Sequence, residues 1–476
     1  MSWEVVIGLE VHCQINTKTK AFCGCSTEFG AEPNTQTCPV CLGMPGQLPV
    51  LNMVAVDKSI LTGLAIGAKI NLESKFDRKN YFYPDLPKGY QISQFTVPIV
   101  EGGYIDIPTK DGEKRLGVTR IHMEEDAGKS MHEGLDAVSH IDLNRSGVPL
   151  MEIVSEPDMR SADEAIAYLK QLHQVIRFLE VSDADMEKGQ FRCDANVSVR
   201  HPGEPFGTRT ELKNMNSFRF IKQAIEYEVL RQIEVIEDGG EVIQESRLWD
   251  SVKNESRSMR SKEEAHDYRY FPEPDLPPLR VSQEEVDAIK AGMPELPGEL
   301  RKRFEIEFGL SPYDADVLSQ TRLLSGWYES LVAAHPADPK RCANWLANEL
   351  LGRLKEANLD IADSPVSAVA LAGLLDRIAD NSISGKIAKD VLDFMMSSGK
   401  DADAIIEEKG LKQVTDTGAI DAIIKEVMDA NPEQVEGYRG GKDKLMGFFV
   451  GQVMKASKGQ ANPGMVNQRL KELLKG

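Results

Sequence analysis

The sequence lacks any long apolar run and has few cysteines for its length. One of its more apolar stretches, Ala368–Leu375, is eight residues long, whereas a membrane-spanning helix needs about 18 to 20 such residues. No basic segment precedes an apolar one near Met1, so no secretory signal is expected. Seven cysteines among 476 residues are too few for a disulfide scaffold. We therefore expect a cytoplasmic protein that has no membrane partner.

Three common catalytic motifs are also missing. A glycine-rich phosphate loop ending at Gly128-Lys129-Ser130 would need a glycine at the position of Met123. The chain has no G-x-S-x-G nucleophile elbow, and no G-x-G-x-x-G fingerprint occurs in a suitable context. These absences argue against a Walker phosphate loop and a serine hydrolase.

Charge is abundant but unevenly distributed. The formal net charge is −19, yet residues 439–476 carry eight Lys or Arg and only two Asp or Glu. A basic tail on an acidic body suggests a local contact with a polyanion such as nucleic acid. On charge alone, a solubilising surface helix remains the simpler explanation of the tail.

Hydrophobic periodicity predicts a mixture of strands and helices in the first part of the chain. Apolar and polar residues alternate over residues 5–12 and 191–200, which indicates strands with one apolar and one polar face. Residues 118–125 form a third such candidate. Apolar residues at three- and four-residue spacing predict helices over residues 162–180 and 218–237.

The character of the chain changes near residue 293. The stretch Met293–Gly298 contains two prolines and a glycine, which is typical of a linker, and the sequence beyond it is mostly helical in pattern. A second break occurs at residues 398–401. The fold class is therefore α+β, and the expected domains are residues 1–292, a helical domain of residues 293–400, and a small helical tail of residues 401–476.

Four of the cysteines form two close pairs. Cys23 and Cys25 are followed, after twelve residues, by Cys38 and Cys41. Two such pairs across a turn-rich loop can supply four thiolates to one zinc ion, and an all-thiolate set indicates a structural site. The alternative is a group of reduced, buried cysteines. A zinc deaminase is excluded because Pro39 follows the third cysteine instead of preceding it, and the nearby order is Glu10-Val11-His12, the reverse of H-x-E.

Carboxylates and a histidine mark the polar faces of the predicted strands. Glu10 and His12 share one face of the first strand. Glu124 and Glu125 are adjacent, so a regular strand presents only one of them to a given site. The other candidates are Asp126, Asp194 and Glu211. Oxygen ligands with an occasional histidine suit Mg²⁺ or Mn²⁺, although on spacing alone an ordinary polar face is the more common explanation.

Seven motifs resemble the B subunit of the bacterial tRNA-dependent amidotransferases. They are Val6–His12, Lys75–Pro84, His122–Ser130, Arg192–Asn196, Leu212–Phe218, Asp267–Asp275 and Lys455–Pro463. Because these motifs extend from residue 6 to residue 463, the resemblance covers essentially the whole chain. It implies a cradle-like α+β domain, then a helical domain, and then a helical tail similar to that of YqeY proteins.

The resemblance also implies an activity. The family's complex is a ligase that forms a carbon–nitrogen bond with glutamine as the amide donor. It converts Glu-tRNA(Gln) to Gln-tRNA(Gln), and often Asp-tRNA(Asn) to Asn-tRNA(Asn). The A subunit, an amidase, releases ammonia, the small C subunit stabilises the assembly, and the B subunit holds the tRNA and uses ATP to phosphorylate its carboxylate. The alternatives are a non-catalytic tRNA-binding subunit and, less favoured, a metal-dependent hydrolase that acts without tRNA.

By resemblance, site residues can be named in the first domain. The expected ligands of Mg²⁺ (or Mn²⁺) are Glu10, His12 and Glu125. Lys79 is expected to neutralise phosphate charge. Asp194 is a further catalytic candidate, and Glu124 and Glu211 are candidates for binding ATP together with Lys79.

The resemblance also gives the basic tail a role. Lys455, Lys458, Arg469 and Lys471 are expected to contact phosphates of the tRNA at a distance from its acceptor end. The cysteine quartet is not universal in the family, which favours a structural role for its zinc ion.

Overall fold

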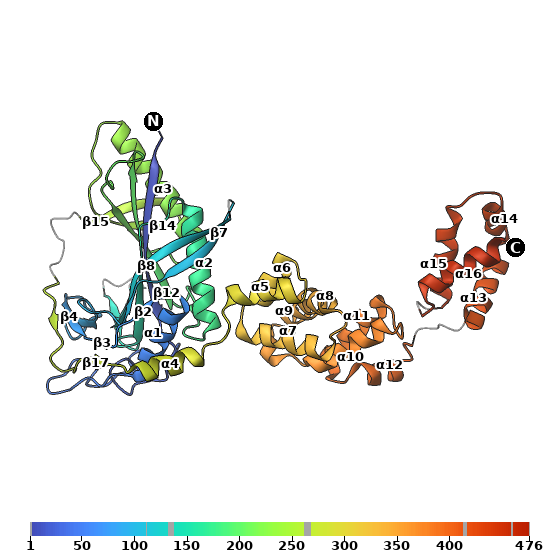
Figure 1. Ribbon diagram of the computed structural model, residues 1–476, viewed down its shortest axis with the longest axis horizontal. Helices are drawn as coiled ribbons and strands as arrows, with labels where there is room; N and C mark the ends of the chain where they lie inside the picture. The colour runs from blue at the N-terminus through green and yellow to red at the C-terminus, as the bar shows by residue number, and fades with distance from the viewer. Residues whose placement is uncertain are drawn as a thin grey trace. The chain divides into compact units, whose positions relative to one another are not determined.

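A computed structural model describes residues 2–110, 112–131, 138–260, 268–412, 417–457 and 460–475. The chain divides into two compact units, Met1–Leu296 and Pro297–Gly476 (Figure 1). The first unit is built on a mixed sheet and the second is helical, which confirms the predicted α+β class. The division into three domains at residues 292/293 and 400/401 stays a prediction.

Four long antiparallel strands form the centre of the sheet. In spatial order they are β12 (Phe191–Arg200), β1 (Glu4–Gln14), β11 (Pro149–Ser155) and β8 (Gly112–Glu125). The strands predicted over residues 5–12, 118–125 and 191–200 are thereby confirmed. Residues directly opposite one another in such a ladder project from the same face of the sheet, so the register decides which polar side chains meet.

Shorter strands extend the sheet on both sides. Beyond β12 lie β13 (Thr210–Lys213), β14 (Ser246–Asp250) and β15 (Glu255–Arg260); beyond β8 lie β5 (Tyr90–Ser93), β4 (Asp77–Asn80) and β16 (Phe271–Pro272). Next to β8 are also β6 (Val100–Glu101), which pairs with β2 (Lys69–Ile70), and β7 (Tyr104–Thr109). Two small ladders join β3 (Glu73–Ser74) to β17 (Leu279–Arg280), and β9 (Lys129–Met131) to β10 (His140–Asp142).

One face of the central strands is apolar and packs against helices. Figure 1 shows α2 (Ala162–Phe178) and α3 (Phe218–Glu237) beside the long strands, and residues of α1 (Met53–Ala65) join the same hydrophobic core. Ser161 and Ser217 cap α2 and α3 by accepting backbone N–H bonds. The helices predicted over residues 162–180 and 218–237 are confirmed. Because the helices cover the apolar face, the opposite face carries the polar residues.

The second unit consists of short helices. After α4 (Gln283–Ala291) in the first unit come α5 (Pro297–Glu307), α6 (Pro312–Leu318), α7 (Arg322–Ala334), α8 (Pro339–Asn344), a π-helical segment (Trp345–Leu350), α9 (Leu351–Glu356), a 3₁₀ turn (Ile361–Asp363), α10 (Ala368–Ala379), α11 (Gly385–Ser398) and α12 (Ala402–Lys409). Residues 292–296 join α4 to α5, so the last two residues of the predicted linker Met293–Gly298 belong to α5 instead.

The last four helices have a core of their own. They are α13 (Thr417–Ala430), α14 (Pro432–Arg439), α15 (Leu445–Ala456) and α16 (Pro463–Lys475). Ile424, Phe449, Val453 and Leu470 are fully buried among them. The apolar faces of these helices thus pack within the tail and leave basic residues on its surface.

A buried ion pair fastens β4 to the segment that follows β16. Arg78 donates to both carboxylate oxygens of Glu273 at 2.7 and 2.8 Å, and the Glu273 side chain is fully buried. Removing the cation leaves that carboxylate uncompensated, so we expect Arg78→Met to lower the free energy of unfolding by about 3–5 kcal/mol. Urea denaturation followed by the circular dichroism of the sheet measures this loss.

The matched control is Arg280→Met. Arg280 pairs with Glu73 at 3.6 Å, and both side chains are more than half exposed. An exposed pair of this kind contributes at most about 1 kcal/mol. Equal effects of the two substitutions would contradict the buried-pair explanation.

Candidate functional site

The polar face of the central strands brings two histidines and two glutamates together. His12 on β1 lies opposite Glu152 on β11, and Glu152 lies opposite His122 on β8. Glu124 is two residues farther along β8, so it projects from the same face. We call His12, His122, Glu124 and Glu152 the central cluster. Ligand atoms of His12, Glu124 and Glu152 all lie within 4.8 Å of one another.

Glu152 lies between the two imidazoles of the central cluster. Its Oε2 atom is 3.5 Å from His12 Nε2 and 3.2 Å from His122 Nε2. The Glu124 carboxylate is 3.9 Å from the same nitrogen of each histidine, and its side chain is buried. His12 is the more exposed of the two histidines and is therefore the more accessible ligand.

The electrostatics of the central cluster favour a cation. Burial lowers the pKa of His12, but the hydrogen bond to Glu152 and the charges of Glu152 and Glu124 outweigh this effect and raise its pKa to about 9. Burial raises the pKa of Glu152, but hydrogen bonds from His12 and His122 lower it below its usual range. Two carboxylates and an imidazole within reach of one point suit Mg²⁺ or Mn²⁺, and such an ion would replace the His12 proton.

Lys79 on β4 provides a fixed positive charge near this cluster. Its Nζ atom lies 4.9 Å from the centre of the Tyr268 ring and 5.9 Å from that of Tyr81. Burial lowers the pKa of Lys79, but the charges of Glu124 and Glu152, with Tyr270, raise it above its ordinary value. The ammonium group therefore stays charged beside the carboxylates, in a position suited to an incoming anion.

Glu10, Asp194 and Glu211 lie on the same face but have partners of their own. Asn196 donates to Glu10 at 2.9 Å. Lys213 Nζ lies 2.6 Å from the Asp194 carboxylate and 2.8 Å from that of Glu211. Burial and nearby carboxylates raise the pKa of Glu10, whereas Lys213 helps to lower that of Glu211. The structure thus groups Asp194 and Glu211 around a lysine, and Glu10 beside an amide.

A pocket of about 660 Å³ opens beside Glu10. Its wall contains apolar side chains, and its polar groups come from both neighbouring strands. The lining residues are Val6, Gly8, Leu9, Glu10, Val154, Ser155, Pro157, Asn196, Ser198, Phe206, Gly207 and Arg209. An apolar wall with a few polar groups is typical of a site for a small organic ligand.

The structure does not bring Glu125 to Glu10 and His12, which corrects the ligand set expected from the resemblance. Adjacent strand residues project from opposite faces, and Glu124 takes the position that faces His12. Glu125 instead forms an ion pair with Lys88 and accepts a hydrogen bond from the Ile92 backbone at 2.9 Å.

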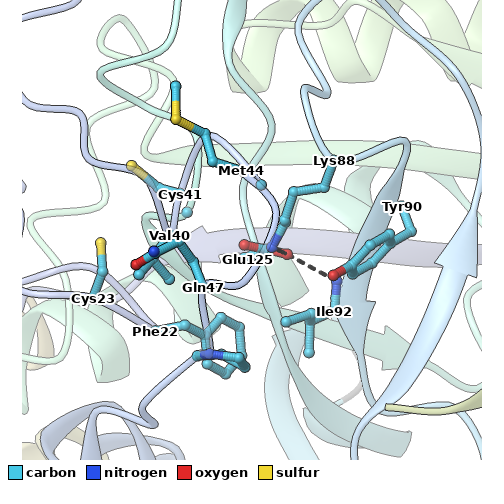
Figure 2. A pocket seen from close by; sticks show the side chains of 13 residues that line it. Phe22, Cys23, Val40, Cys41, Met44, Gln47, Lys88, Tyr90, Ile92 and Glu125 are labelled. Atoms are coloured by element: carbon cyan, nitrogen blue, oxygen red, sulfur yellow. Dashed lines mark hydrogen bonds and ion pairs between the residues drawn. The ribbon is translucent and has the colours of Figure 1, made fainter. Parts of the chain in front are cut away.

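Glu125 and Lys88 line a second pocket of about 510 Å³. Figure 2 shows Cys23 and Cys41 on one side of this pocket, with the Lys88–Glu125 pair and Ile92 across from them. Glu125 thus lies closer to the cysteine loop than its neighbour Glu124 does, because the two side chains leave β8 in opposite directions.

The four clustered cysteines converge as their spacing predicts. The sulfur atoms of Cys23, Cys25, Cys38 and Cys41 lie within 4.8 Å of one another, and those of Cys38 and Cys41 are 3.9 Å apart. Tetrahedral zinc with bonds of about 2.3 Å needs sulfurs about 3.8 Å apart. A hydrogen bond from Cys23 lowers the pKa of Cys41 despite burial, and the Cys38 backbone and the charge of Lys20 add to this effect. The cluster could therefore hold a zinc ion.

The tail residues differ in what surrounds them. Lys455 and Lys471 are exposed, and Lys458 lies outside the described residues. Arg469 on α16 binds both carboxylate oxygens of Asp421 on α13 and also pairs with Glu472. Two carboxylates therefore balance its charge, and the expectation that Arg469 contacts RNA stays a prediction.

Three residues of this face were not predicted from the sequence. Glu152 lies in the mostly apolar stretch Pro149–Ser155, and only its register opposite His12 reveals it. His122 and Lys213 both belong to motifs shared with the amidotransferase family, which is the one signal that could have found them.

No helix among the described residues is long and apolar enough to cross a membrane.

Comparison with known proteins covers nearly the whole chain. The GatB/GatE catalytic domain model matches residues 5–287, and the GatB domain model matches residues 327–474. A protein of Syntrophotalea carbinolica is 62% identical over 475 residues, and one of Alkalilimnicola ehrlichii is 60% identical over 476. Each is named as the B subunit of an aspartyl/glutamyl-tRNA(Asn/Gln) amidotransferase, and the matches cover 100% of this chain and 99% and 100% of theirs. The chain therefore belongs to the family of aspartyl/glutamyl-tRNA(Asn/Gln) amidotransferase B subunits.

Proposed function

We propose that this chain activates the side-chain carboxylate of misacylated Glu-tRNA(Gln), Asp-tRNA(Asn) or both with ATP. Ammonia released from glutamine by an amidase A subunit then converts the activated acid to the amide, in a cytoplasmic complex that also contains a small C subunit. The observation that carries this proposal is the central cluster with Lys79 beside it. Family membership supports the amidotransferase context.

The proposed chemistry has two steps. A carboxylate oxygen of the aminoacyl group attacks the γ-phosphorus of ATP, the bond to the β,γ-bridging oxygen breaks, and ADP leaves. Ammonia then attacks the acyl carbon, phosphate leaves with the C–O bond electrons, and the nitrogen loses a proton. Because the substrate carboxylate is the nucleophile, the chain needs no nucleophilic side chain. Phosphoryl transfer depends mainly on positioning and on neutralising charge.

The residues of the polar face fit these needs. His12, Glu124 and Glu152 would hold Mg²⁺ or Mn²⁺, which when bound supplies charge neutralisation for phosphate oxygens. Lys79 offers a second positive charge that the Tyr268 and Tyr81 rings hold in place.

We place the nucleoside of ATP in the pocket beside Glu10. Val154 and Pro157 give that pocket an apolar wall for a base, while Asn196 and Ser198 offer polar contacts. Lys79, on the same face, would neutralise the charge of the phosphate oxygens. These contacts would bring the nucleotide to the face that holds the central cluster.

The metal ligands can be tested by matched substitutions. We expect Glu124→Gln and Glu152→Gln each to lower the rate of amide formation at least about a hundredfold, equivalent to about 2.7 kcal/mol of barrier. The reason is the loss of a charged ligand that would hold the ion at the phosphates. Glutamine hydrolysis by the amidase partner should persist, and Mn²⁺ binding measured by electron paramagnetic resonance should weaken in parallel.

Glu101→Gln is the control, because Glu101 is an exposed carboxylate on β6 paired with Lys69. Normal amide formation by both cluster variants would remove the central cluster from the mechanism. An intact complex that binds Glu-tRNA(Gln) but hydrolyses no ATP in its presence would instead favour a non-catalytic tRNA-binding subunit, for which the basic tail is the supporting observation.

The zinc ion proposed for the cysteine cluster can be tested by metal analysis. We expect about one zinc ion per chain in reduced, purified protein, because four thiolates complete a tetrahedral site. Cys25→Ser should reduce the zinc content and lower the melting temperature, whereas Cys342→Ser, at a buried cysteine outside the cluster, should leave zinc bound. Zinc-free protein with an unchanged melting temperature would argue for ordinary reduced cysteines.

We propose that the exposed tail lysines contact the tRNA body. Lys455→Ala combined with Lys471→Ala should raise KM for the tRNA and reduce the log–log salt slope of binding by about one for each phosphate that is no longer neutralised. The rate at saturating tRNA should change little, because the residues proposed for activation lie in the first unit. Lys290→Ala, at an exposed lysine on α4, controls for a general loss of charge. An unchanged KM and slope would assign the tail to assembly or solubility.

A further inference from the structure

Lys20 is a buried cation whose ammonium group contacts a carbonyl oxygen and a cysteine sulfur. Its side chain is among the largest that are fully buried. Its Nζ atom lies 3.3 Å from the Leu143 carbonyl oxygen and 3.7 Å from the sulfur of Cys41. Within the described parts of the chain, no aspartate or glutamate lies within ion-pair distance of it. The contrast is Lys88, on the opposite side of the neighbouring pocket, which pairs with Glu125.

A single carbonyl does not compensate a buried ammonium group. Moving such an ion out of water costs several kcal/mol even after the protein relaxes, and this cost is ordinarily offset by an opposite charge. The surroundings of Lys20 therefore need an anion that the ordinary ion pairs of the chain do not supply.

The cysteine cluster has the complementary imbalance. Four thiolates around one Zn²⁺ ion carry a net charge of about −2 by formal count. The sulfur of Cys41 is buried and accepts a hydrogen bond from the Cys38 backbone N–H at 3.2 Å. Lys20 is the cation that reaches this sulfur, so the two unbalanced charges are in contact.

We propose that the Lys20 ammonium is the counter-ion of the zinc–thiolate group, which it reaches through a hydrogen bond to Cys41. This inference rests on the proposed zinc site and deepens it. Lys20 is a positioning residue, since it acts through Cys41 and does not touch the metal. Zinc and the lysine stabilise each other: the ion keeps the thiolates anionic, and the thiolates offset the buried positive charge.

The contact also connects the zinc site to the wall of the Lys88–Glu125 pocket. A Cβ atom at Gly147 would lie 3.4 Å from Cys41 Cβ, 3.5 Å from Lys20 Cδ and 3.8 Å from Glu125 Oε2. These three side chains thus converge on one point of the backbone. Loss of zinc would leave Lys20 uncompensated next to this wall, in which Figure 2 labels Cys41 and Glu125.

The test compares Lys20→Met, Lys20→Arg and Lys18→Met. Methionine keeps much of the apolar stem without the charge, arginine keeps the charge, and Lys18 is an exposed lysine on the same segment. Zinc affinity is measured by competition with a chromophoric chelator in the full-length protein. We expect Lys20→Met to weaken zinc binding about 10- to 100-fold, the usual effect of losing a partner of a metal ligand. Lys20→Arg should retain more affinity than Lys20→Met, and Lys18→Met should match the unmodified protein.

A second readout separates charge balance from simple packing. If Lys20 is the counter-ion, Lys20→Met lowers the melting temperature of the zinc-loaded protein and has a smaller or opposite effect on the zinc-free protein. With cobalt in place of zinc, the thiolate-to-metal charge-transfer band of Lys20→Met should lie at lower energy than that of the unmodified protein. The reason is that the Cys41 sulfur loses a hydrogen bond from a cation.

The outcomes are distinguishable. Equal destabilisation of the loaded and zinc-free forms, with an unchanged band and affinity, would overturn the counter-ion role and leave the zinc site intact. Failure of the unmodified protein to bind zinc would overturn the zinc site itself and the present inference with it. Should Lys20→Met not fold, Lys20→Gln takes its place, because it keeps a hydrogen-bond donor without the charge. Weaker zinc binding than in Lys20→Arg supports the role, and an affinity and cobalt band equal to those of Lys20→Arg contradict it.

Discussion

The antiparallel register of β12, β1, β11 and β8 is the constraint on which the site depends. It is fixed by burial: the apolar residues of these strands face the helices, and a slip of one residue would move them to the opposite face. The same register places His12 opposite Glu152 and Glu152 opposite His122. The hydrophobic core therefore sets the geometry of the charged cluster, although no charged residue of that cluster belongs to the core.

Such a face is stable only because its charges are mutually compensated. Several of its carboxylates pair with cations: Glu152 lies between two imidazoles, Asp194 and Glu211 share Lys213, and Asp126 bonds to Arg192 at 3.0 Å. Replacing a proton on His12 with a divalent cation keeps that compensation while opening coordination positions to a substrate. The carboxylates of this face would attract a divalent cation. The bound cation would in turn bind the anionic groups of a substrate.

Much of the fold was predictable from the sequence, and the site was predictable only in part. Period-two alternation identified β1 and β12, and cysteine spacing identified a group that does converge. Alternation shows that one of Glu124 and Glu125 faces a site without showing which; the resemblance favoured Glu125, whereas Glu124 is the one that faces His12. Glu152 could not be found at all, since its role arises from a strand pairing between residues 140 positions apart. The pairing of Arg469 could not be foreseen for a similar reason: its partner Asp421 lies on another helix.

The adjacent residues Glu124 and Glu125 of β8 lie in two different environments. Glu124 faces the histidines, and Glu125 faces Lys88 and the pocket bordered by Cys41. Glu124 and Glu125 share one stretch of backbone, so a displacement of the end of β8 moves both carboxylates together. The directions of the two side chains stay fixed by the strand geometry. The cysteine loop packs against this end of the strand, with Ser146 and Gly147 between them. A rigid metal-bound loop at this position would hold β8 in register with β11, so a structural ion remote from the central cluster would still help to fix its geometry.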